Sequence, residues 1–233
     1  MATDLDTWFQ GRAGAYLLRQ ERAVLTEILP TAFGFYLLQT GAWGPVHGLL
    51  QSSPARSRVV LDAHAGDADL CADPAYLPLA SDSVDAVLLP HTLERTPDPH
   101  QILREAERVL LGEGHLIVLG FHPWGAWGLR QQLAFSSPWG GRFVRAGRLR
   151  EWLAVLGFET LFVKPYLFRP PFTHDALLVK SGFLDRWRWR PTAGAYMLAA
   201  RKRVSCLTPL RQQRAPVQRA FAGVIKPSTR ARG

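Results

Sequence analysis

The stretch that decides the fold runs from Leu77 to Glu94 and reads LPLASDSVDAVLLPHTLE, with DPH following at 98–100. A polar turn leads into an apolar run over 84–89, which predicts a buried strand. Pro90 and His91 come directly after that strand. Because ligands of open α/β sheets bind beyond the carboxyl ends of the strands, we expect His91 and its neighbours to lie at a functional site.

The segment after this strand predicts a well-defined helix. Asp98 can cap it, Pro99 occupies the first helical position, and Gln101 stands three residues after the cap, as in a capping box. Apolar residues at helical spacing predict its buried face: Ile102, Leu103, Ala106, Val109 and Leu110. The charged residues between them are predicted to form its solvated face: Arg104, Glu105, Glu107 and Arg108.

Hydrophobic patterns predict further elements on both sides of this unit. An amphipathic helix is expected over 12–29, ended by Pro30. Only ten residues separate Asp62 from Asp73, fewer than a parallel crossover with a helix needs, so the helix at that edge is expected to be lost or reduced to a turn. The other expected strands cover 33–39, 58–61, 70–73, 115–119, 158–164 and 195–200, and the other helices cover 46–51, 148–156 and 175–187.

A glycine turn is expected after the first strand. The chain reads TGAWGP over 40–45, and the order of strand, glycine turn and helix N-terminus is typical of a Rossmann-like unit that cradles an anion. Gly-x-x-Gly alone is more often a simple turn than a site. Asp62 lies 21 positions after Gly41, near the spacing at which an acid reaches a ribose. Two readings of Asp62 stay open, a ribose-binding carboxylate and a turn aspartate.

Two segments of the chain resemble one protein family. The stretch at 77–94 with DP at 98–99 resembles the LPF-x-D-x-S-F-D-x-V…LEH…DP segment of class I S-adenosylmethionine-dependent methyltransferases, type 11. The run over 103–116 resembles the L-x-E-x-x-R-V-L-x-P-G-G-x-L segment of the same family. The resemblance implies a Rossmann-like α/β sheet of order 3-2-1-4-5-7-6, with helices on both faces, an antiparallel last strand and, here, one shortened crossover.

The resemblance also implies the cofactor, S-adenosyl-L-methionine, and the residues that hold it. Asp73 is the counterpart of the family's acid that contacts the adenine amino group. His91 is the candidate general base or substrate contact, because an imidazole can accept a proton near neutral pH; the alternative is that His91 only packs beside Pro90. The expected cofactor-binding residues are Gln39, Gly41, Gly44, Asp62, Asp73, Leu77 and Pro90.

The first strand departs from the family pattern V-L-D-x-G-x-G-x-G. Trp43 stands where the second glycine would be, and Gly44 falls one position short of the third. Gln39 replaces the acid that, in the family, helps hold the ammonium group of the cofactor, and an uncharged amide holds a cation less strongly. These departures favour the alternative that the chain kept the fold and lost turnover.

A loop beyond the fifth strand is the candidate substrate pocket. His122, Trp124 and Trp127 lie past the carboxyl end of that strand, where they can form the wall of a pocket. The opposing interpretation is structural, because tryptophans pack under loops more often than they contact ligands. No Asn-Pro-Pro-Tyr motif follows the fourth strand and no Pro-Cys pair is present, which shifts the expected acceptor from bases and glutamine to a small molecule.

Charge is distributed unevenly along the chain. The 233 residues include 28 Lys and Arg and 19 Asp and Glu. Nine of the cations and none of the acids lie in 201–233, so the remaining 19 cations balance the 19 acids and this segment carries the whole +9. Rich in charge and interrupted by prolines, it is expected to be disordered. It is either an arm for nucleic acid or an acidic surface, or a solvated tail that only aids solubility.

These observations divide the chain into an N-terminal helical segment at 1–30, a methyltransferase-like domain at 31–203 and a basic tail at 204–233. Cys71 and Cys206 allow at most one disulfide and no zinc cluster, which favours a reduced cytoplasmic setting. We expect neither a transmembrane segment nor an N-terminal leader.

Three functional hypotheses follow. The leading one is an S-adenosylmethionine-dependent methyltransferase that acts on a small molecule. The second is a catalytically inactive binding or scaffold protein with the same fold. The third is an RNA-directed protein recruited through its basic tail. The acceptor and the oligomeric state stay open.

Overall fold

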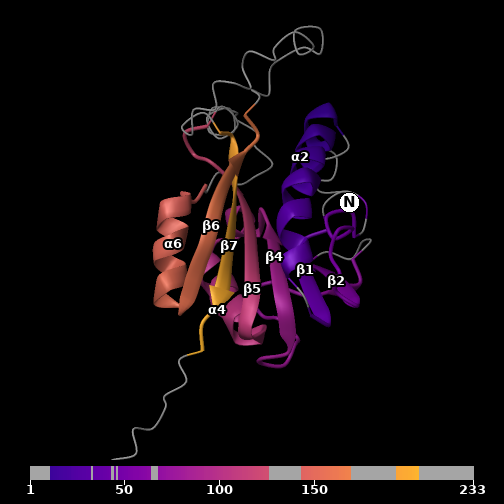
Figure 1. The fold of residues 1–233 in the computed structure, drawn as a ribbon, viewed down its shortest axis with the longest axis vertical. Coiled ribbons are helices and arrows are strands. Elements are labelled where there is room, and N and C mark those ends of the chain that lie inside the picture. The colour runs from indigo at the N-terminus through magenta and orange to yellow at the C-terminus, as the bar shows by residue number, and fades with distance from the viewer. Residues whose placement is uncertain are drawn as a thin grey trace, which may run out of the picture.

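A computed structural model describes residues 11–32, 34–42, 45, 47–63, 68–125, 143–168 and 193–204. Within this part of the chain the strands form one seven-stranded sheet in the order β3-β2-β1-β4-β5-β7-β6, which confirms the predicted topology (Figure 1). The strands are β1 (Tyr36–Thr40), β2 (Ser57–Asp62), β3 (Leu70–Cys71), β4 (Val84–Pro90), β5 (Leu110–Phe121), β6 (Phe158–Tyr166) and β7 (Ala195–Lys202). The helices are α2 (Arg12–Ile28), the 3₁₀-helix η1 (Leu29–Thr31), α3 (Thr92–Arg95), α4 (Pro99–Val109) and α6 (Ala146–Val155).

The sheet has a parallel part and an antiparallel part. The neighbours β3, β2, β1, β4 and β5 pair in parallel, whereas β7 pairs antiparallel with both β5 and β6. The carboxyl ends of β1, β2, β3 and β4 therefore meet at one edge of the sheet, where ligands of open α/β sheets bind.

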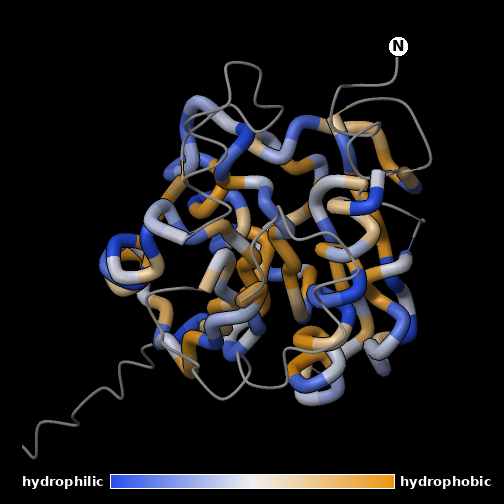
Figure 2. Tube along the Cα trace, turned by 90° about the horizontal axis from the view of Figure 1, so that it is seen from above, coloured by the Kyte–Doolittle hydropathy of each residue, from blue (hydrophilic) through white to orange (hydrophobic). Residues whose placement is uncertain are grey.

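Helices cover both faces of the sheet. On one face, α2 packs with Leu49 and Leu50 against residues of β1, β4, β5 and β7. On the other face, α4 and α6 pack against alternate residues of the same strands. Figure 2 shows hydrophobic segments gathered in the interior, between these two layers. Because successive side chains of a strand point to opposite faces, one apolar strand such as β4 contributes to both cores.

The predicted amphipathic helix at 12–29 is confirmed as α2, with its end at Ile28. It belongs to the main core, because Leu17 and Leu25 are fully buried in it. Glu21 lies on the same buried face of α2 and is also inaccessible to solvent. None of the helices in the described ranges is long and apolar enough to span a membrane.

Helix α4 begins as predicted. The carboxylate of Asp98 accepts a hydrogen bond from the backbone N–H of Gln101 at 3.1 Å, and Pro99 is the first helical residue. The Gln101 side chain does not complete the capping box, because it donates instead to the carbonyl of Ala75 at 3.1 Å.

The predicted solvated face of α4 is partly wrong. Glu105 accepts the backbone N–H of Leu77 at 2.9 Å, and the Arg108 guanidinium donates to the carbonyls of Leu77 and Leu79. These two charged side chains, which also pair with each other at 2.8 Å, fasten the 77–79 segment to the helix. The pairing holds the pKa of Glu105 below its usual range. Spacing alone did not show this, because the partner groups lie on another segment.

The predicted helix at 46–51 is wrong. The described residues from His47 onward form successive turns, with bonds from Gly48 to Pro45 and from Leu50 to His47 that span three residues. The shortened crossover agrees with the structure, since β3 follows β2 closely and the described residues between them are not helical. Strand β5 is longer than expected, because the residues from Leu110 already pair with β4. The helix expected at 175–187 lies outside the described residues.

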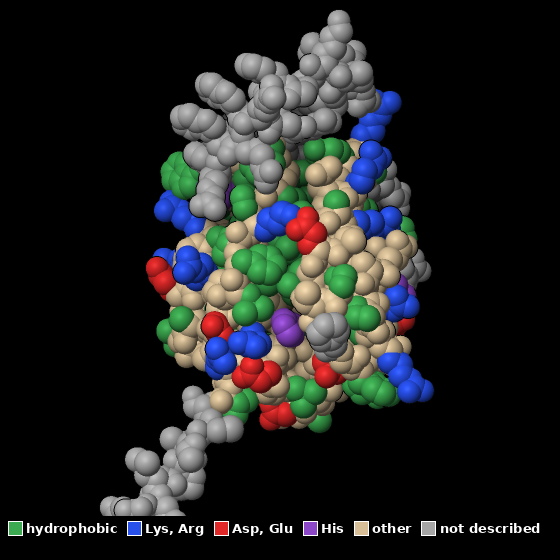
Figure 3. Space-filling model, in the orientation of Figure 1, with side chains coloured by type: hydrophobic (Ala, Val, Ile, Leu, Met, Phe, Trp, Pro, Cys, Tyr) green, Lys and Arg blue, Asp and Glu red, His purple; other side chains and the backbone are tan. Residues whose placement is uncertain are grey.

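The first three cations of the basic segment belong to the folded domain. Lys202 ends β7 and lies 2.9 Å from Asp82, while Arg201 and Arg203 both pair with Glu159. Acidic and basic side chains are intermixed on this face of the molecule (Figure 3). The expectation that the whole positive charge from residue 201 belongs to a free arm is therefore wrong for these three residues. The other six cations lie outside the described residues.

Candidate functional site

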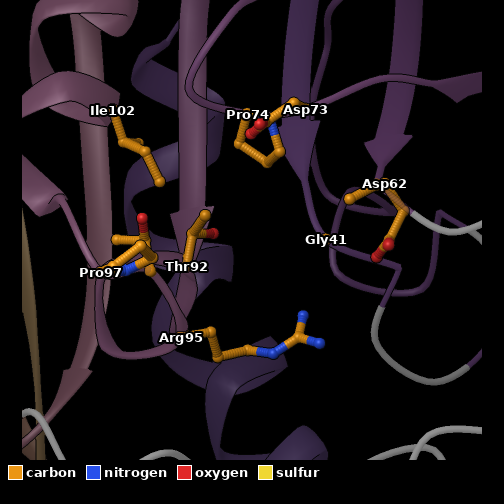
Figure 4. A pocket seen from close by; sticks show the side chains of 10 residues that line it. Gly41, Asp62, Asp73, Pro74, Thr92, Arg95, Pro97 and Ile102 are labelled. Atoms are coloured by element: carbon orange, nitrogen blue, oxygen red, sulfur yellow. The ribbon is translucent and has the colours of Figure 1, made fainter.

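A pocket of about 190 Å³ opens where the carboxyl ends of β1, β2 and β4 meet (Figure 4). Gly41 follows β1, Asp62 ends β2, and Asp73 follows β3, so three of the predicted cofactor-binding residues line the same pocket. The complete lining is Gly41, Asp62, Ala63, Asp73, Pro74, Thr92, Arg95, Thr96, Pro97 and Ile102.

Gly41 and Asp62 together build the turn after β1. Gly41 has φ +90°, a left-handed conformation that a residue with a Cβ adopts only with strain. The Asp62 carboxylate accepts the backbone N–H of Ala42 at 2.8 Å. Asp62 thus acts as a turn residue and also lines the pocket, so the two readings of this aspartate are compatible. Gly44 and Trp43 lie outside the described residues.

Asp73 lines the pocket beside Pro74 (Figure 4). One carboxylate oxygen accepts the backbone N–H of Ala75 at 2.8 Å, which fixes the side chain. The next residue, Pro74, and Ile102 of α4 add apolar surface beside it (Figure 4). Because α4 also binds the carbonyl of Ala75 through Gln101, the helix sets the position of this wall.

Gln39 lies buried beneath the glycine turn. Its side-chain N–H donates to the carbonyl of Gly41 at 2.7 Å, and its Oε1 atom is buried with no hydrogen-bond partner among the described residues. A buried acceptor without a partner is costly, and such an atom beside a site is often completed by a ligand or a water. Gln39 itself is not among the residues that line the described pocket, whereas the carboxylates of Asp62 and Asp73 on that lining fit a cofactor that brings hydrogen-bond donors.

Like Gln39, the predicted cofactor residues Leu77 and Pro90 are not in the pocket lining. Leu77 is buried in the core beside α4, and Pro90 is the buried last residue of β4. Leu77 is held there by the Glu105 and Arg108 contacts described above.

His91 lies in a buried ionic cluster rather than in the pocket lining. It adopts a left-handed backbone conformation with φ +53° immediately after β4. Its Nε2 atom is 2.6 Å from Oε1 of Glu21, and its Nδ1 atom is 2.8 Å from Oε2 of Glu94. The other oxygen of Glu94 accepts the backbone N–H of Phe121. Tyr166 of β6 completes the cluster with a 3.4 Å contact from its hydroxyl to Glu21.

The cluster changes the protonation of its members. Burial alone would lower the pKa of His91, but the negative charges of Glu94 and Glu21 outweigh it and raise the pKa to about 9. Burial raises the pKa of Glu94, although His91 opposes that effect. At neutral pH His91 is therefore an imidazolium that donates from both ring nitrogens, and in this state it holds a proton instead of accepting one.

A second cavity, of about 460 Å³, lies near the candidate substrate loop. His122 lines it with Arg150 of α6 and residues of β6 and β7. Burial and Arg145 lower the pKa of His122, so this imidazole is neutral at neutral pH. Trp124 is 67% exposed and packs under the Arg145 guanidinium, outside the cavity lining. Trp127 lies outside the described residues.

Sequence reasoning missed Glu21 and Arg95. Glu21 carried a signal, because it occupies a position on the apolar stripe of α2, where a charged residue is buried and needs a partner. Arg95 carried none, since its place in the pocket depends on how the short helix α3 is oriented after His91.

The sheet order, the glycine turn after β1 and the acids after β2 and β3 on one pocket define the class I methyltransferase architecture. Residues 36–118 match the family model of the methyltransferase domain. The chain belongs to the type 11 family of class I S-adenosylmethionine-dependent methyltransferases, and S-adenosylmethionine is its cofactor.

Two similar proteins carry the description uncharacterized protein. YafS of Escherichia coli (strain K12) is 34% identical over 188 residues, which cover 78% of this chain and 75% of that protein. Mb2026c of Mycobacterium bovis is 27% identical over 201 residues, which cover 78% of this chain and 70% of that protein.

Solved structures share the fold at low sequence identity. One is the putative methyltransferase in a complex with the Trm112 methyltransferase activator of Haloferax volcanii, with a TM-score of 0.63, 18% identity, and coverage of 88% of this chain and 100% of that one. Another is a SAM-dependent methyltransferase from Archaeoglobus fulgidus, with a TM-score of 0.60, 17% identity, and coverage of 84% and 97%.

Proposed function

We propose that this methyltransferase binds S-adenosylmethionine in the pocket between Gly41, Asp62 and Asp73 and methylates a small molecule. The observation that carries the proposal is that two carboxylates and the glycine turn, which are distant in sequence, line the same pocket. S-adenosylmethionine needs a hydrogen-bond acceptor for its ribose hydroxyls and another for its adenine amino group. The carboxylates of Asp62 and Asp73 are the two proposed acceptors.

The bound cofactor supplies a methyl group on a sulfonium, and the protein contributes alignment and exclusion of water. In the proposed arrangement Asp62 accepts from the ribose and Asp73 from the adenine amino group. Pro74 and Ile102 provide apolar surface for the adenine ring. Gln39 supports the glycine turn from beneath through its bond to the carbonyl of Gly41.

We propose that His91 has a positioning role instead of that of a general base. The imidazolium links α2 through Glu21 to the start of α3 and, through Glu94, to the end of β5. It thus fixes the edge of the sheet from which Thr92 and Arg95 reach the pocket.

Calorimetric titration with S-adenosylmethionine and S-adenosylhomocysteine tests the proposed pocket. Asp62→Asn and Asp73→Asn should each weaken binding about ten- to a hundredfold, because each removes a charged acceptor. Glu151→Gln, an exposed change on α6, is the matched control and should leave binding unchanged. If the unmodified chain binds neither compound, or binding survives both substitutions, the proposed pocket is wrong.

Incubation with radiolabelled S-adenosylmethionine and fractionated cell extract tests the acceptor class. Label that appears in small molecules supports the proposal, whereas label confined to RNA or protein contradicts it. The neutral Gln39 beneath the turn favours one alternative, a protein that binds the cofactor without turnover. That alternative predicts cofactor binding in the calorimeter and no transfer to any fraction.

A role of the basic tail in RNA binding is tested by truncation. Because Arg201, Lys202 and Arg203 are paired within the domain, the shortened chain should end after Val204, which leaves those pairs intact. Salt-sensitive RNA binding that disappears on this truncation supports the role, and RNA binding that survives it excludes the tail as the binding segment.

A further inference from the structure

The candidate cofactor pocket contains a cation, Arg95. This residue ends α3 and is half-buried, and its guanidinium extends across the pocket toward the side of Asp62 and Gly41 (Figure 4). Arg95 is the only Lys or Arg among the residues that line this described pocket. The glycine turn and the cation thus lie on the same side of the pocket.

The backbone that carries Arg95 is firmly positioned. The hydroxyls of Thr92 and Thr40 lie 2.8 Å apart and tie the start of α3 to the end of β1. Glu94, the residue before Arg95, is held by His91 and by the N–H of Phe121. The backbone next to Arg95 is thus fixed on both the β1 and β5 sides, and the guanidinium extends into the pocket (Figure 4).

The pocket lining carries charges of both signs. Asp62 and Asp73 are carboxylates and Arg95 is a cation, while Gln39 beneath the turn is neutral. The amino-acid end of S-adenosylmethionine carries both an ammonium and a carboxylate. Within this described lining the guanidinium of Arg95 is the group that attracts the carboxylate, because charge-assisted hydrogen bonds are about twice as strong as neutral ones.

We infer that Arg95 binds the carboxylate of the methionine moiety and so provides the main charged contact at the amino-acid end of the cofactor. This inference rests on the proposed function, since it requires the cofactor in this pocket. The planar guanidinium matches a carboxylate with two parallel N–H donors, which a lysine cannot do. In the family an acid at the position of Gln39 contacts the ammonium group, whereas in this chain Arg95 contacts the carboxylate.

Two compounds that differ only in this carboxylate test the inference. S-adenosylmethionine and decarboxylated S-adenosylmethionine are titrated calorimetrically into the full chain and its Arg95→Met variant. The variant should bind S-adenosylmethionine about ten- to a hundredfold more weakly, and bind the decarboxylated compound as well as the unmodified chain does. Arg95→Lys should lose part of the affinity for S-adenosylmethionine, because it keeps the charge and loses the two-donor geometry.

Two control variants separate the possible failures. Arg104→Met removes an exposed cation of α4 outside the pocket lining and should change neither affinity. Asp62→Asn should weaken both compounds equally. An Arg95→Met variant that weakens both compounds equally, or neither, overturns the inference and leaves the proposed function standing. An unmodified chain that binds neither compound overturns both.

Discussion

The buried cluster of Glu21, His91 and Glu94 makes the stability of this protein depend on pH in a defined direction. The folded-state pKa of His91 is raised from 6.5 to about 9. The folded protein therefore holds a proton that the unfolded chain releases above pH 6.5. This contribution to the free energy of unfolding is complete below pH 6.5 and is lost as the pH rises through about 9. The raised pKa of Glu94 also lowers the free energy of unfolding as the pH rises, and this effect begins at lower pH because the ordinary pKa of a glutamate is lower than that of a histidine.

The magnitude follows from the two pKa values of His91. One pH unit between folded and unfolded pKa corresponds to about 1.4 kcal/mol, so the rise from 6.5 to about 9 contributes about 3 kcal/mol. We expect Glu21→Gln to reduce this contribution. The substitution keeps the size of the side chain and one acceptor oxygen, but it removes a negative charge 2.6 Å from Nε2 of His91. Loss of such a charge lowers the pKa of the imidazole by about one to three pH units.

Urea unfolding followed by tryptophan fluorescence between pH 5.5 and 9.5 measures the effect. The difference in unfolding free energy between the unmodified chain and Glu21→Gln should be largest near pH 6.5. It should shrink toward pH 9 by about 1.4 kcal/mol for each pH unit by which the pKa of His91 falls. The His91 imidazole resonances should show the same fall in pKa by NMR.

Glu27→Gln is the matched control, because Glu27 lies on the same helix and is exposed, where it pairs with Lys164. A surface pair of this kind contributes about 0–1 kcal/mol, so this variant should show little pH dependence of its own. A difference for Glu21→Gln that stays constant with pH, or a His91 that titrates below 6.5 in the unmodified chain, would refute the reasoning.

Three further predictions concern the elements that support the pocket. Asp98→Ala should lower the free energy of unfolding by about 1 kcal/mol in urea titrations, because the N-cap bond to Gln101 is lost; an unchanged midpoint would contradict the cap. Gly41→Ala should lower the free energy of unfolding by about 1–2 kcal/mol in the same assay, because φ of residue 41 is +90°. An unchanged free energy would mean that the turn adopts another backbone conformation without strain. Lys202→Met should lower the free energy of unfolding by about 1–3 kcal/mol, because Nζ donates to the carbonyls of Glu107 and Leu110 at 2.7 and 2.8 Å. A smaller loss than that of Asp98→Ala would indicate that water molecules replace the ammonium group at these carbonyls.

The architecture was predictable from sequence because it rests on local patterns. The apolar run at 84–89, the cap at Asp98 and the stripe of α2 each specify an element from neighbouring residues. The strand order came from the family resemblance and was confirmed. Asp62 was identifiable from its place at a strand end and its spacing from Gly41, whereas Asp73 came from the family resemblance; both line one pocket because parallel strands bring their carboxyl ends together.

Only the tertiary structure decided which side chains meet. Glu21 and His91 are separated by 70 residues in sequence and lie 2.6 Å apart, and the charges of Glu94 and Glu21 raise the pKa of this buried imidazole to about 9. Arg95 enters the pocket because α3 is held by contacts to β1 and β5. Periodicity identifies a buried position, but the charge state of a buried group depends on its partners, and folding brings those partners from distant parts of the chain.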